Sequence, residues 1–446
     1  MSKNDMAPAS KAQLIQRILG RKTGSEAVDG RMAETAAGGR HATREIPEAY
    51  TRFDRHPGYE KMLVPKAMAD RLGVRNPFFR SHDGVAAART RIGGRDYLNF
   101  SNYNYLGLSA HPQVNAAAKA AIDQYGTSAS ASRLVAGERP VQRELEESLA
   151  QVYDVDDCVV FVSGHATNVS TIGYLFGPKD LVIHDSLIHN SILQGIQLSG
   201  AARRSFPHND SAALERILAE IRGQFERVLI VIEGLYSMDG DIPDLPAFID
   251  IKRRYKAFLM VDEAHALGVL GQTGKGSHEH FGVAGRDVDI WMGTLSKTLA
   301  SCGGYIAGDR ALVEMLKYAA SGFVYSVGIS PVLAAASLEA LRIMQREPER
   351  VERLRARGSQ FLAAMRSIGV DTGFAQGHAV VPAITGSSLK AARLSSQLFD
   401  AGINVQPIIH PAVEEKAARL RFFLSASHTE DDIHTACEAV KKLMKK

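Results

Sequence analysis

From about residue 96 onward the chain alternates short apolar runs with helical stretches, and this alternation constrains its fold more than any other feature. The clearest apolar runs cover residues 158–162, 181–184, 228–232, 258–261 and 290–292. Runs this short and this apolar are typical of strands that are buried on both faces of a mainly parallel sheet. Helical stretches such as 211–222 and 245–256 lie between them, as crossover connections do. We therefore predict an α/β fold.

The composition is that of a globular protein. Hydrophobic residues make up 45% and charged residues 23% of the 446 residues, which excludes wholesale disorder, collagen-like repeats and a coiled-coil rod. Lys and Arg number 53 and Asp and Glu number 49, so the net charge is +4. A charge this small indicates neither a nucleic-acid partner nor a membrane surface.

The three cysteines, Cys158, Cys302 and Cys437, are widely separated and odd in number. They predict neither a disulfide framework nor a metal site, and they favour a reducing, cytoplasmic location. The first twenty residues lack the apolar core of a secretory signal. The uncharged stretch 318–338 is long enough to span a bilayer, but its glycines, serines and Pro331 favour buried protein over an integral membrane segment.

Four parts of the chain are expected. Residues 1–50 form an N-terminal extension of flexible composition, and residues 51–95 form a segment that packs on the small domain. Residues 96–335 form a large domain, and residues 336–446 form a smaller α+β domain with strands near 379–384 and 419–425. Within the extension, residues 11–19 predict a short basic helix, which is either a tail without a role or a docking helix for a partner.

Polar residues directly follow several of the predicted strands, where ligands bind in open α/β sheets. They are Ser163-Gly164-His165, Asp185 with His189, Asp262-Glu263-Ala264-His265 and Gly293-Thr294-Leu295-Ser296-Lys297. The Asp-Glu-Ala-His sequence also occurs in helicases, which need an upstream phosphate loop. The nearest candidate loop, 271–276, has the wrong spacing and lies downstream, so nucleotide hydrolysis is rejected.

Lys297 follows a predicted strand among Thr, Ser and Gly residues. A lysine in this setting can form a Schiff base with an aldehyde cofactor, while nearby hydroxyls and backbone N–H groups hold a phosphate. Taken alone, a lysine in a loop is more often a solvated surface residue. The interpretation therefore depends on the motifs around it.

Those motifs together resemble the α-oxoamine synthase family of fold-type I pyridoxal-phosphate (PLP) enzymes, over about residues 95–440. This family includes 5-aminolevulinate synthase, 8-amino-7-oxononanoate synthase, 2-amino-3-ketobutyrate ligase and serine palmitoyltransferase. The matching segments are 104–107, 132–134, 163–168, 208–210, 233–241, 262–265, 293–297 and 419–421. The resemblance implies a fold-type I transferase, with a large PLP-binding domain of mainly parallel sheet and a smaller C-terminal domain.

The resemblance also implies a role for each matched residue. Lys297 would hold PLP as a Schiff base and then act as the general base. Asp262 would pair with the pyridine nitrogen, and His265 would hydrogen-bond the phenolic oxygen. His189 would lie against the ring face. Ser237 would also contact PLP.

The phosphate and the substrate carboxylate have their own implied partners. The amides of Gly164 and His165, together with Thr294, would bind the phosphate. Ser326 matches a position whose hydroxyl reaches the phosphate of the neighbouring subunit, which implies a homodimer with shared active sites. Arg421 would pair with the carboxylate of the amino acid, although a surface arginine on a C-terminal strand is the alternative.

Departures from the family pattern bear on the substrates. Tyr103 stands at a position where glycine- and alanine-using members usually have Asn. Serine palmitoyltransferases are similar to this chain there, so we expect L-serine as the first substrate, then L-alanine or glycine. His410 replaces an arginine of some 8-amino-7-oxononanoate synthases, which argues against a pimeloyl chain. Gln142 replaces a histidine of the family. The stretch 164–180 resembles synthases that work with acyl-carrier proteins.

The expected reaction is a decarboxylative Claisen condensation of an α-amino acid with an acyl thioester, which gives an α-amino ketone and carbon dioxide. The thioester is carried by coenzyme A or by an acyl-carrier protein. One alternative is another fold-type I reaction, either amino transfer or aldol-type cleavage. A second is a non-catalytic partner subunit of a heterodimeric synthase, but such subunits lack the Schiff-base lysine that Lys297 supplies here.

Overall fold

The computed structural model describes residues 46–71 and 75–444, which fall into two compact units, Met1–Met68 and Ala69–Lys446. The described part of the first unit contains η1 (Glu48–Tyr50) and η2 (Phe53–Arg55), and α2 (Pro57–Arg71) begins there. The helix expected at residues 11–19 lies outside the described residues. All other elements belong to the second unit.

A seven-stranded sheet organises the second unit, with the strand order β3-β9-β8-β7-β6-β4-β5. The strands are β3 (Asp157–Phe161), β4 (Leu181–Asp185), β5 (Ala202–Phe206), β6 (Val228–Glu233), β7 (Phe258–Asp262), β8 (Ile290–Thr294) and β9 (Gly304–Gly308). Neighbours from β8 to β5 pair in parallel, whereas β9 runs antiparallel to both β8 and β3. The predicted α/β fold with a mainly parallel sheet is confirmed.

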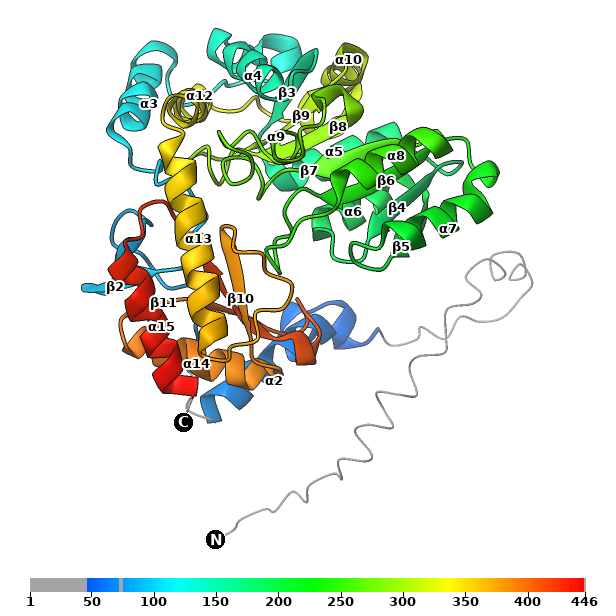
Figure 1. Cartoon of the computed structure of the whole chain (residues 1–446). Coiled ribbons are helices and arrows are strands. Elements are labelled where there is room, and N and C mark those ends of the chain that lie inside the picture. The colour runs from blue at the N-terminus through cyan, green and yellow to red at the C-terminus, as the bar shows by residue number, and fades with distance from the viewer. Residues whose placement is uncertain (1–45, 72–74, 445–446) are drawn as a thin grey trace. The chain divides into compact units, whose positions relative to one another are not determined.

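Alternate residues of the central strands belong to two separate hydrophobic cores, one on each face of the sheet. In β6, Ile230 and Ile232 belong to one core, and Leu229 and Val231 belong to the other. The first core includes residues of α4 (Pro140–Tyr153), α7 (Ser211–Ile221), α8 (Leu245–Tyr255) and α12 (Pro331–Arg346); the second includes residues of α5 (Gly164–Leu175), α6 (Asn190–Ser199), α10 (Arg310–Ala319) and α11 (Ser321–Val324). Helices therefore cover both faces (Figure 1).

The helices that follow the central strands begin at side-chain caps. Ser163 precedes α5 and accepts a hydrogen bond from the Ala166 N–H at 3.4 Å, and His189 precedes α6 and accepts one from the Ser191 N–H at 3.3 Å. Asp210 and Asp244 cap α7 and α8 in the same way. Because caps occupy the turn between strand and helix, this arrangement places polar side chains at one edge of the sheet.

Two smaller sheets lie outside the large one. One has the order β10-β13-β12 and is antiparallel, and the other has the order β1-β2-β11. Their strands are β1 (Arg89–Ile92), β2 (Arg95–Asn99), β10 (Val380–Ile384), β11 (Ile403–Asn404), β12 (Gln406–Ile408) and β13 (Arg419–Phe423). Of the two C-terminal strands expected from the sequence, both are present, as β10 and β13.

The other elements are α3 (Pro112–Tyr125), η3 (Arg133–Gly137), η4 (Arg222–Gln224), α9 (Ser277–Phe281), η5 (Gly285–Asp287), α13 (Glu349–Ser367), α14 (Ser388–Asp400), η6 (Glu415–Ala417) and α15 (Glu430–Met444). Among the described helices, none has the length and apolar character needed to cross a membrane. The stretch 318–338 covers the end of α10, all of α11, the connecting residues 325–330 and the first part of α12. The interpretation of it as buried holds for Phe323 and Ile329, but it is wrong for Tyr318 and Tyr325, whose exposed fractions are 72% and 87%.

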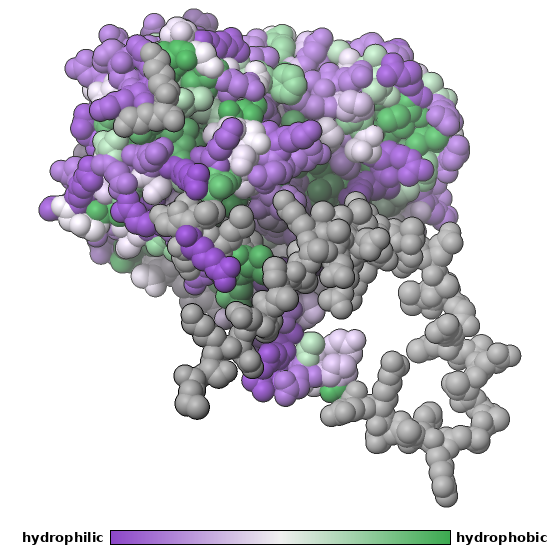
Figure 2. All heavy atoms as spheres, turned by 90° about the horizontal axis from the view of Figure 1, so that it is seen from below, coloured by the Kyte–Doolittle hydropathy of each residue, from purple (hydrophilic) through white to green (hydrophobic). Residues whose placement is uncertain are grey.

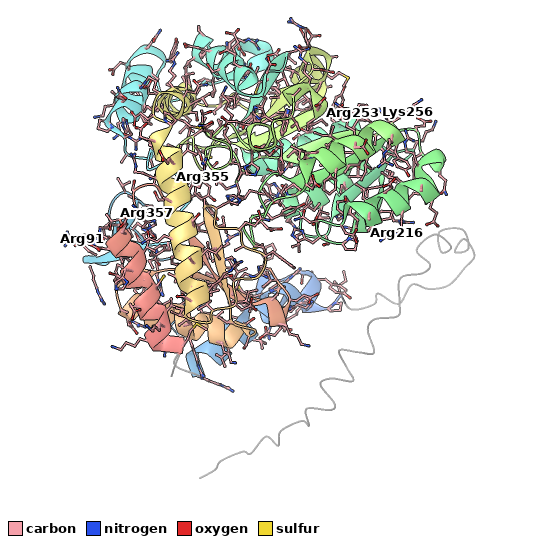
Figure 3. The ribbon with its side chains drawn as sticks, in the orientation of Figure 1. Arg91, Arg216, Arg253, Lys256, Arg355 and Arg357 are labelled. Atoms are coloured by element: carbon pink, nitrogen blue, oxygen red, sulfur yellow. The ribbon has the colours of Figure 1, made fainter. Side chains whose placement is uncertain are left out.

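Charged side chains are dispersed over the surface. The cations labelled in Figure 3 come from β1, α7, α8 and its C-cap, and α13, and some of them pair with acids, as Arg253 does with Asp287 and Arg357 with Glu430. Figure 2 shows polar and apolar side chains interspersed over the face that it presents. Such mixing is typical of a solvated protein surface.

Candidate active site

A cavity of about 350 Å³ lies at the carboxyl ends of β6, β7 and β8. This is the edge at which open α/β sheets bind ligands. The predicted site residues that line the cavity are Tyr103, Gly164, His165, His189, Ser237, Asp262, His265, Thr294, Lys297 and Arg421. The fold thus brings together residues from the ends of β6, β7 and β8, from the starts of α5 and α6, from the loop after β2 and from the C-terminal strand β13.

Two predicted site residues do not line this cavity. Ser326 is half-buried in the segment that follows α11. His410 is exposed, and its backbone N–H donates to the Ser388 hydroxyl at 3.1 Å. Within this subunit, therefore, neither side chain forms part of the cavity wall.

Lys297 lies in the turn that follows β8. Burial lowers the pKa of its ammonium group to about 8, although the charges of Asp262 and Glu233 oppose this shift. Its Nζ lies 5.6 Å from the centre of the Tyr103 ring. Because a lowered pKa increases the fraction of neutral amine, Lys297 is suited to attack an aldehyde near neutral pH.

Asp262 and Glu233 form a pair of buried carboxyl groups at the ends of neighbouring strands, where they are opposite each other in the register. Asp262 accepts hydrogen bonds from the Asn168 side-chain amide at 3.1 Å and from the Ala264 N–H at 3.0 Å. Burial, followed by the charge of Asp262, raises the pKa of Glu233 to about 8. Glu233 is therefore mostly protonated at neutral pH beside an Asp262 that is held by amide donors.

Two histidines line the same cavity, and each is held through its Nδ1 atom. His265 Nδ1 lies 2.7 Å from the Tyr105 hydroxyl, and burial lowers the pKa of His265 well below its usual value. His189 Nδ1 lies 2.7 Å from the Ser191 hydroxyl, and burial also lowers the pKa of His189. Both imidazoles are therefore neutral at physiological pH, and each has its Nδ1 atom fixed by a hydroxyl group.

The start of α5 forms a close-packed cradle with the β8–β9 connection. A Cβ atom added to Gly164 would lie 3.0 Å from Thr294 Oγ1, and one added to Gly304 would lie 2.6 Å from the Gly164 Cα. Gly164 and His165 are the first residues of the helix, where backbone N–H groups have no partner within it. Together with the hydroxyls of Ser163, Thr294 and Ser296, this cradle fits a phosphate group.

Arg421 reaches the cavity from β13, where it is opposite Pro382 and Gln406 in the register. Its Nη1 donates to the Ser237 carbonyl at 2.9 Å. Its Nε is buried and has no hydrogen-bond partner within the described part of the chain. A guanidinium group with a donor to spare at a cavity wall is suited to bind a carboxylate.

The cavity also includes polar residues that the sequence analysis did not select, among them Asn168, Ser191 and Glu233. Asn168 and Glu233 belong to the matched segments 163–168 and 233–241, so their motifs were the available signal. Ser191 lies two residues after His189 and shares its hydroxyl between His189 and Asn168. No sequence pattern distinguishes such a hydroxyl from an ordinary helix serine.

Comparisons with known proteins agree with this geometry. The family model for aminotransferase class I and II matches residues 95–440. An 8-amino-7-oxononanoate synthase of Symbiobacterium thermophilum is 40% identical over 355 residues, or 80% of this chain and 90% of the relative. The synthase of Geobacter sulfurreducens is 41% identical over 368 residues, covering 82% and 93% of the two chains.

Solved structures give the same result. A serine palmitoyltransferase structure with PLP superposes with a TM-score of 0.83 at 27% identity and covers 87% of this chain and 98% of that one. The serine palmitoyltransferase of Sphingomonas wittichii gives a TM-score of 0.83 at 26% identity, with the same coverage. The 8-amino-7-oxononanoate synthase of Francisella tularensis gives 0.68 at 26% identity and covers 78% and 98% of the two chains.

Proposed function

The chain belongs to the aminotransferase class I and II family, and we propose that its cavity condenses an α-amino acid with an acyl thioester and releases carbon dioxide. The protein is a PLP-dependent α-oxoamine synthase of the kind that its relatives and structural neighbours represent. The observation that carries the proposal is the convergence of Lys297, Asp262, His265 and Arg421 on one cavity with a phosphate cradle. When bound, PLP supplies an electron sink that stabilises a carbanion at the substrate α-carbon.

The groups that line the cavity are of the types that PLP needs. The cradle at the start of α5 would hold the phosphate, and the neutral Lys297 amine would hold the aldehyde carbon. The Asp262 carboxylate would keep a proton on the ring nitrogen. If the Tyr105 hydroxyl donates to His265 Nδ1, the Nε2–H of His265 is left to donate to the phenolic oxygen. His189 would cover the ring face.

The proton and carboxylate steps use two residues. Lys297 Nζ would take the α-proton of the amino acid, because burial lowers its pKa to about 8 and so raises the fraction of free amine near neutral pH. Arg421 would bind the amino acid's carboxylate and orient the breaking bond. We propose L-serine as the first substrate, then L-alanine or glycine. The support for serine is Tyr103, which stands at the position that distinguishes serine-using members and lines the cavity. Its ring lies edge-on to the Phe423 ring, with 4.7 Å between the ring centres.

We propose that the enzyme is a homodimer in which Ser326 completes the phosphate site of the partner subunit. Exposed apolar side chains surround this segment: the exposed fractions are 44% for Leu134, 82% for Val135, 87% for Tyr325 and 50% for Val327. A second copy of the chain would cover them.

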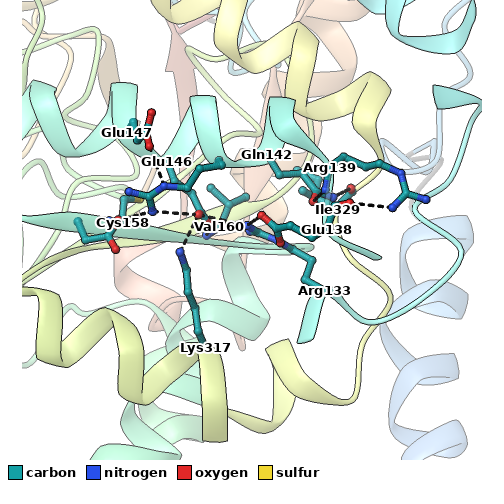
Figure 4. Close-up of polar contacts among 12 residues, drawn as sticks. Arg133, Glu138, Arg139, Gln142, Glu146, Glu147, Cys158, Val160, Lys317 and Ile329 are labelled. Carbon is teal, nitrogen blue, oxygen red and sulfur yellow. Dashed lines mark hydrogen bonds and ion pairs between the residues drawn. The ribbon is translucent and has the colours of Figure 1, made fainter. Parts of the chain in front are cut away.

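The segment that carries Ser326 is attached to a buried charge network. The Gly328 N–H donates to the Ala131 carbonyl at 3.0 Å, and the Gln142 amide donates to the Ile329 carbonyl at 2.7 Å. Next to these contacts, Glu146 pairs with Arg133 and with Lys317 (Figure 4). This network gives the proposed subunit contact a fixed backbone. It also assigns Gln142 a structural role.

Titration with amino acids tests the reaction. The visible absorption band of the purified protein with PLP should shift saturably with serine, alanine or glycine, and Lys297→Ala should alter that band. With the preferred amino acid and an acyl-coenzyme A, free thiol and carbon dioxide should appear in equal amounts. Release of a 2-oxo acid with no thiol would instead indicate amino transfer, and the absence of any cofactor band after PLP is added would exclude the reaction.

We also propose a cytoplasmic location, which is supported by the three unpaired cysteines.

For the second substrate we propose a thioester that is bound to an acyl-carrier protein, with residues 1–45 as the segment that docks this carrier. Deleting these residues should then impair turnover of a carrier-bound acyl group more than turnover of the same acyl group on coenzyme A. Equal effects on both thioesters would contradict carrier docking and leave the condensation itself unaffected.

A further inference from the structure

We propose that His208 is a positioning residue, which clamps two walls of the candidate active site together between the carboxylates of Asp185 and Asp241. His208 itself does not line the cavity. The inference rests on the proposed function for its link to substrate binding. The clamp itself follows from contacts that do not depend on that function.

Both ring nitrogens of His208 contact a buried carboxylate. Nδ1 lies 3.0 and 3.1 Å from the two Asp185 oxygens, and Nε2 lies 2.8 Å from an Asp241 oxygen. The side-chain exposed fractions of Asp185 and Asp241 are 0% and 4%. Because an ionised carboxylate only accepts hydrogen bonds, both nitrogens donate, and His208 is an imidazolium cation.

The charges around the ring support this protonation state. Burial opposes the charge of His208, but hydrogen bonds and attraction from Asp185 and Asp241 outweigh it and raise the pKa of His208 to about 10. Among the described residues, the other groups that face the ring are uncharged: the Tyr236 and Phe374 rings, centred 4.4 and 5.7 Å away, and the Asn209 amide, which donates to Asp241 at 2.8 Å.

One arm of the clamp holds the wall that carries His189. Asp185 is the last residue of β4, and its carboxylate also accepts hydrogen bonds from the backbone N–H groups of Leu187 and Asn209, both at 2.8 Å. Four residues after Asp185, His189 caps α6 and lines the cavity. The position of Asp185 therefore sets the path of the chain into His189.

The other arm holds the wall that carries Ser237. Residues 236–241 form a tight turn, in which the Tyr236 N–H donates to the Asp241 carbonyl and the Gly240 N–H donates to the Tyr236 carbonyl, both at 2.9 Å. Within this turn the Ser237 carbonyl accepts the hydrogen bond from Arg421. Anchoring of Asp241 by His208 therefore fixes the acceptor that orients the Arg421 guanidinium.

Removing the imidazolium would leave two buried carboxylates close together without a counter-ion. Such an arrangement is strongly unfavourable, and separation of the β4 loop from the 236–241 turn would relieve it. His189 and Arg421 would then lose their fixed separation. The expected consequence is weaker binding of PLP and of the amino acid carboxylate.

The test is a double-mutant cycle between His208→Gln and Arg421→Lys. Binding of the amino acid is measured by titrating the absorption of the PLP-loaded protein, and binding of PLP is measured on the apo-protein by fluorescence. We expect His208→Gln to weaken amino acid binding about tenfold, and the double variant to bind no more weakly than Arg421→Lys alone. His428→Gln is the matched control, because His428 is also buried but packs on Phe100 away from the cavity.

The outcomes separate the clamp from the proposed function. If Arg421→Lys leaves amino acid binding unchanged, the assignment of the carboxylate site fails, whereas the clamp is still tested by the PLP affinity of His208→Gln. Strict additivity of the two substitutions, or unchanged PLP and amino acid binding in His208→Gln, would overturn the clamp.

If His208→Gln does not fold, nitrogen NMR of the wild-type protein decides whether His208 is a cation. Two protonated ring nitrogens at pH 8 are expected for His208, and a neutral ring would contradict the inference.

Discussion

At the scale of single residues, the candidate site is defined by side chains whose protonation differs from that in water. Burial moves the pKa of Lys297 down and that of Glu233 up, so both groups reach a value of about 8. The two shifts have the same cause, because a low-dielectric site disfavours the charged form of each group. Near pH 8, therefore, about half of each group is in its uncharged form, the neutral amine of Lys297 and the protonated carboxyl group of Glu233.

The pKa of Lys297 predicts how the apo-protein captures its cofactor. Only the neutral amine attacks an aldehyde, so the rate of PLP capture should rise with pH and level off above about 8. Stopped-flow absorbance of apo-protein mixed with PLP measures this rate. Lys119→Ala, at an exposed position on α3, should keep the same profile. A rate that continues to rise toward pH 10.5, the usual lysine value, would show that burial does not tune Lys297.

Tyr103 predicts the choice of amino acid. Its ring lies at the cavity wall near Lys297. The family resemblance implies that glycine- and alanine-using members usually have Asn at this position. Tyr103→Asn should therefore lower kcat/KM for serine relative to alanine and glycine. Competition between the three amino acids for one acyl thioester measures the ratio. Tyr318→Asn, at an exposed position, should leave the ratio unchanged.

At the scale of elements, helix starts place the polar groups. Ser163 caps α5 while the first residues of that helix line the phosphate cradle, so one local feature serves both folding and binding. Much of this was readable from the sequence, because strand ends followed by Ser, Asp or His are local patterns. In the large sheet, strands β5 and β9 were not predicted: β5 is an edge strand with exposed Arg203 and Arg204, and β9 begins and ends with glycine. The short strands β1, β2, β11 and β12 were not predicted either.

The cap predicts a separable effect on stability and on cofactor binding. Ser163→Ala should lower the free energy of unfolding by about 1 kcal/mol through loss of the cap, and it should also weaken PLP binding. Asp244→Ala is the matched control, because Asp244 caps α8 with the same 3.4 Å hydrogen bond but does not line the cavity. Urea unfolding and PLP titration measure the two effects. Equal PLP affinity in both variants would contradict a role for the α5 cap in the cradle.

For the whole molecule, the proposed dimer predicts that two inactive variants can restore activity to each other when their subunits are mixed. If Ser326 completes the partner's site, a mixture of inactive Lys297→Ala and Ser326→Trp subunits should regain about a quarter of the wild-type activity, because half of the dimers contain one intact site. Activity after mixing and refolding measures this recovery.

A mixture of Lys297→Ala with Asp262→Asn is the control for subunit exchange. Both residues line the cavity of the same subunit, so no mixed dimer has an intact site and no activity should return. Failure of the first mixture to regain activity, with exchange of subunits demonstrated, would place each complete site within one chain.

The expected division of the chain into four parts, at residues 1–50, 51–95, 96–335 and 336–446, stays a prediction.

The α/β fold, the family and ten of the residues that line the cavity could be predicted from local periodicity and from short sequence motifs. Which charged groups face one another depends instead on the tertiary structure. Asp185, His208 and Asp241 come from three separate segments and meet because β4 lies between β5 and β6 in the sheet. Glu233 and Asp262 likewise become neighbours through the register of β6 and β7. Pairing across a sheet is a long-range property, and so are burial and the pKa shifts that follow from it.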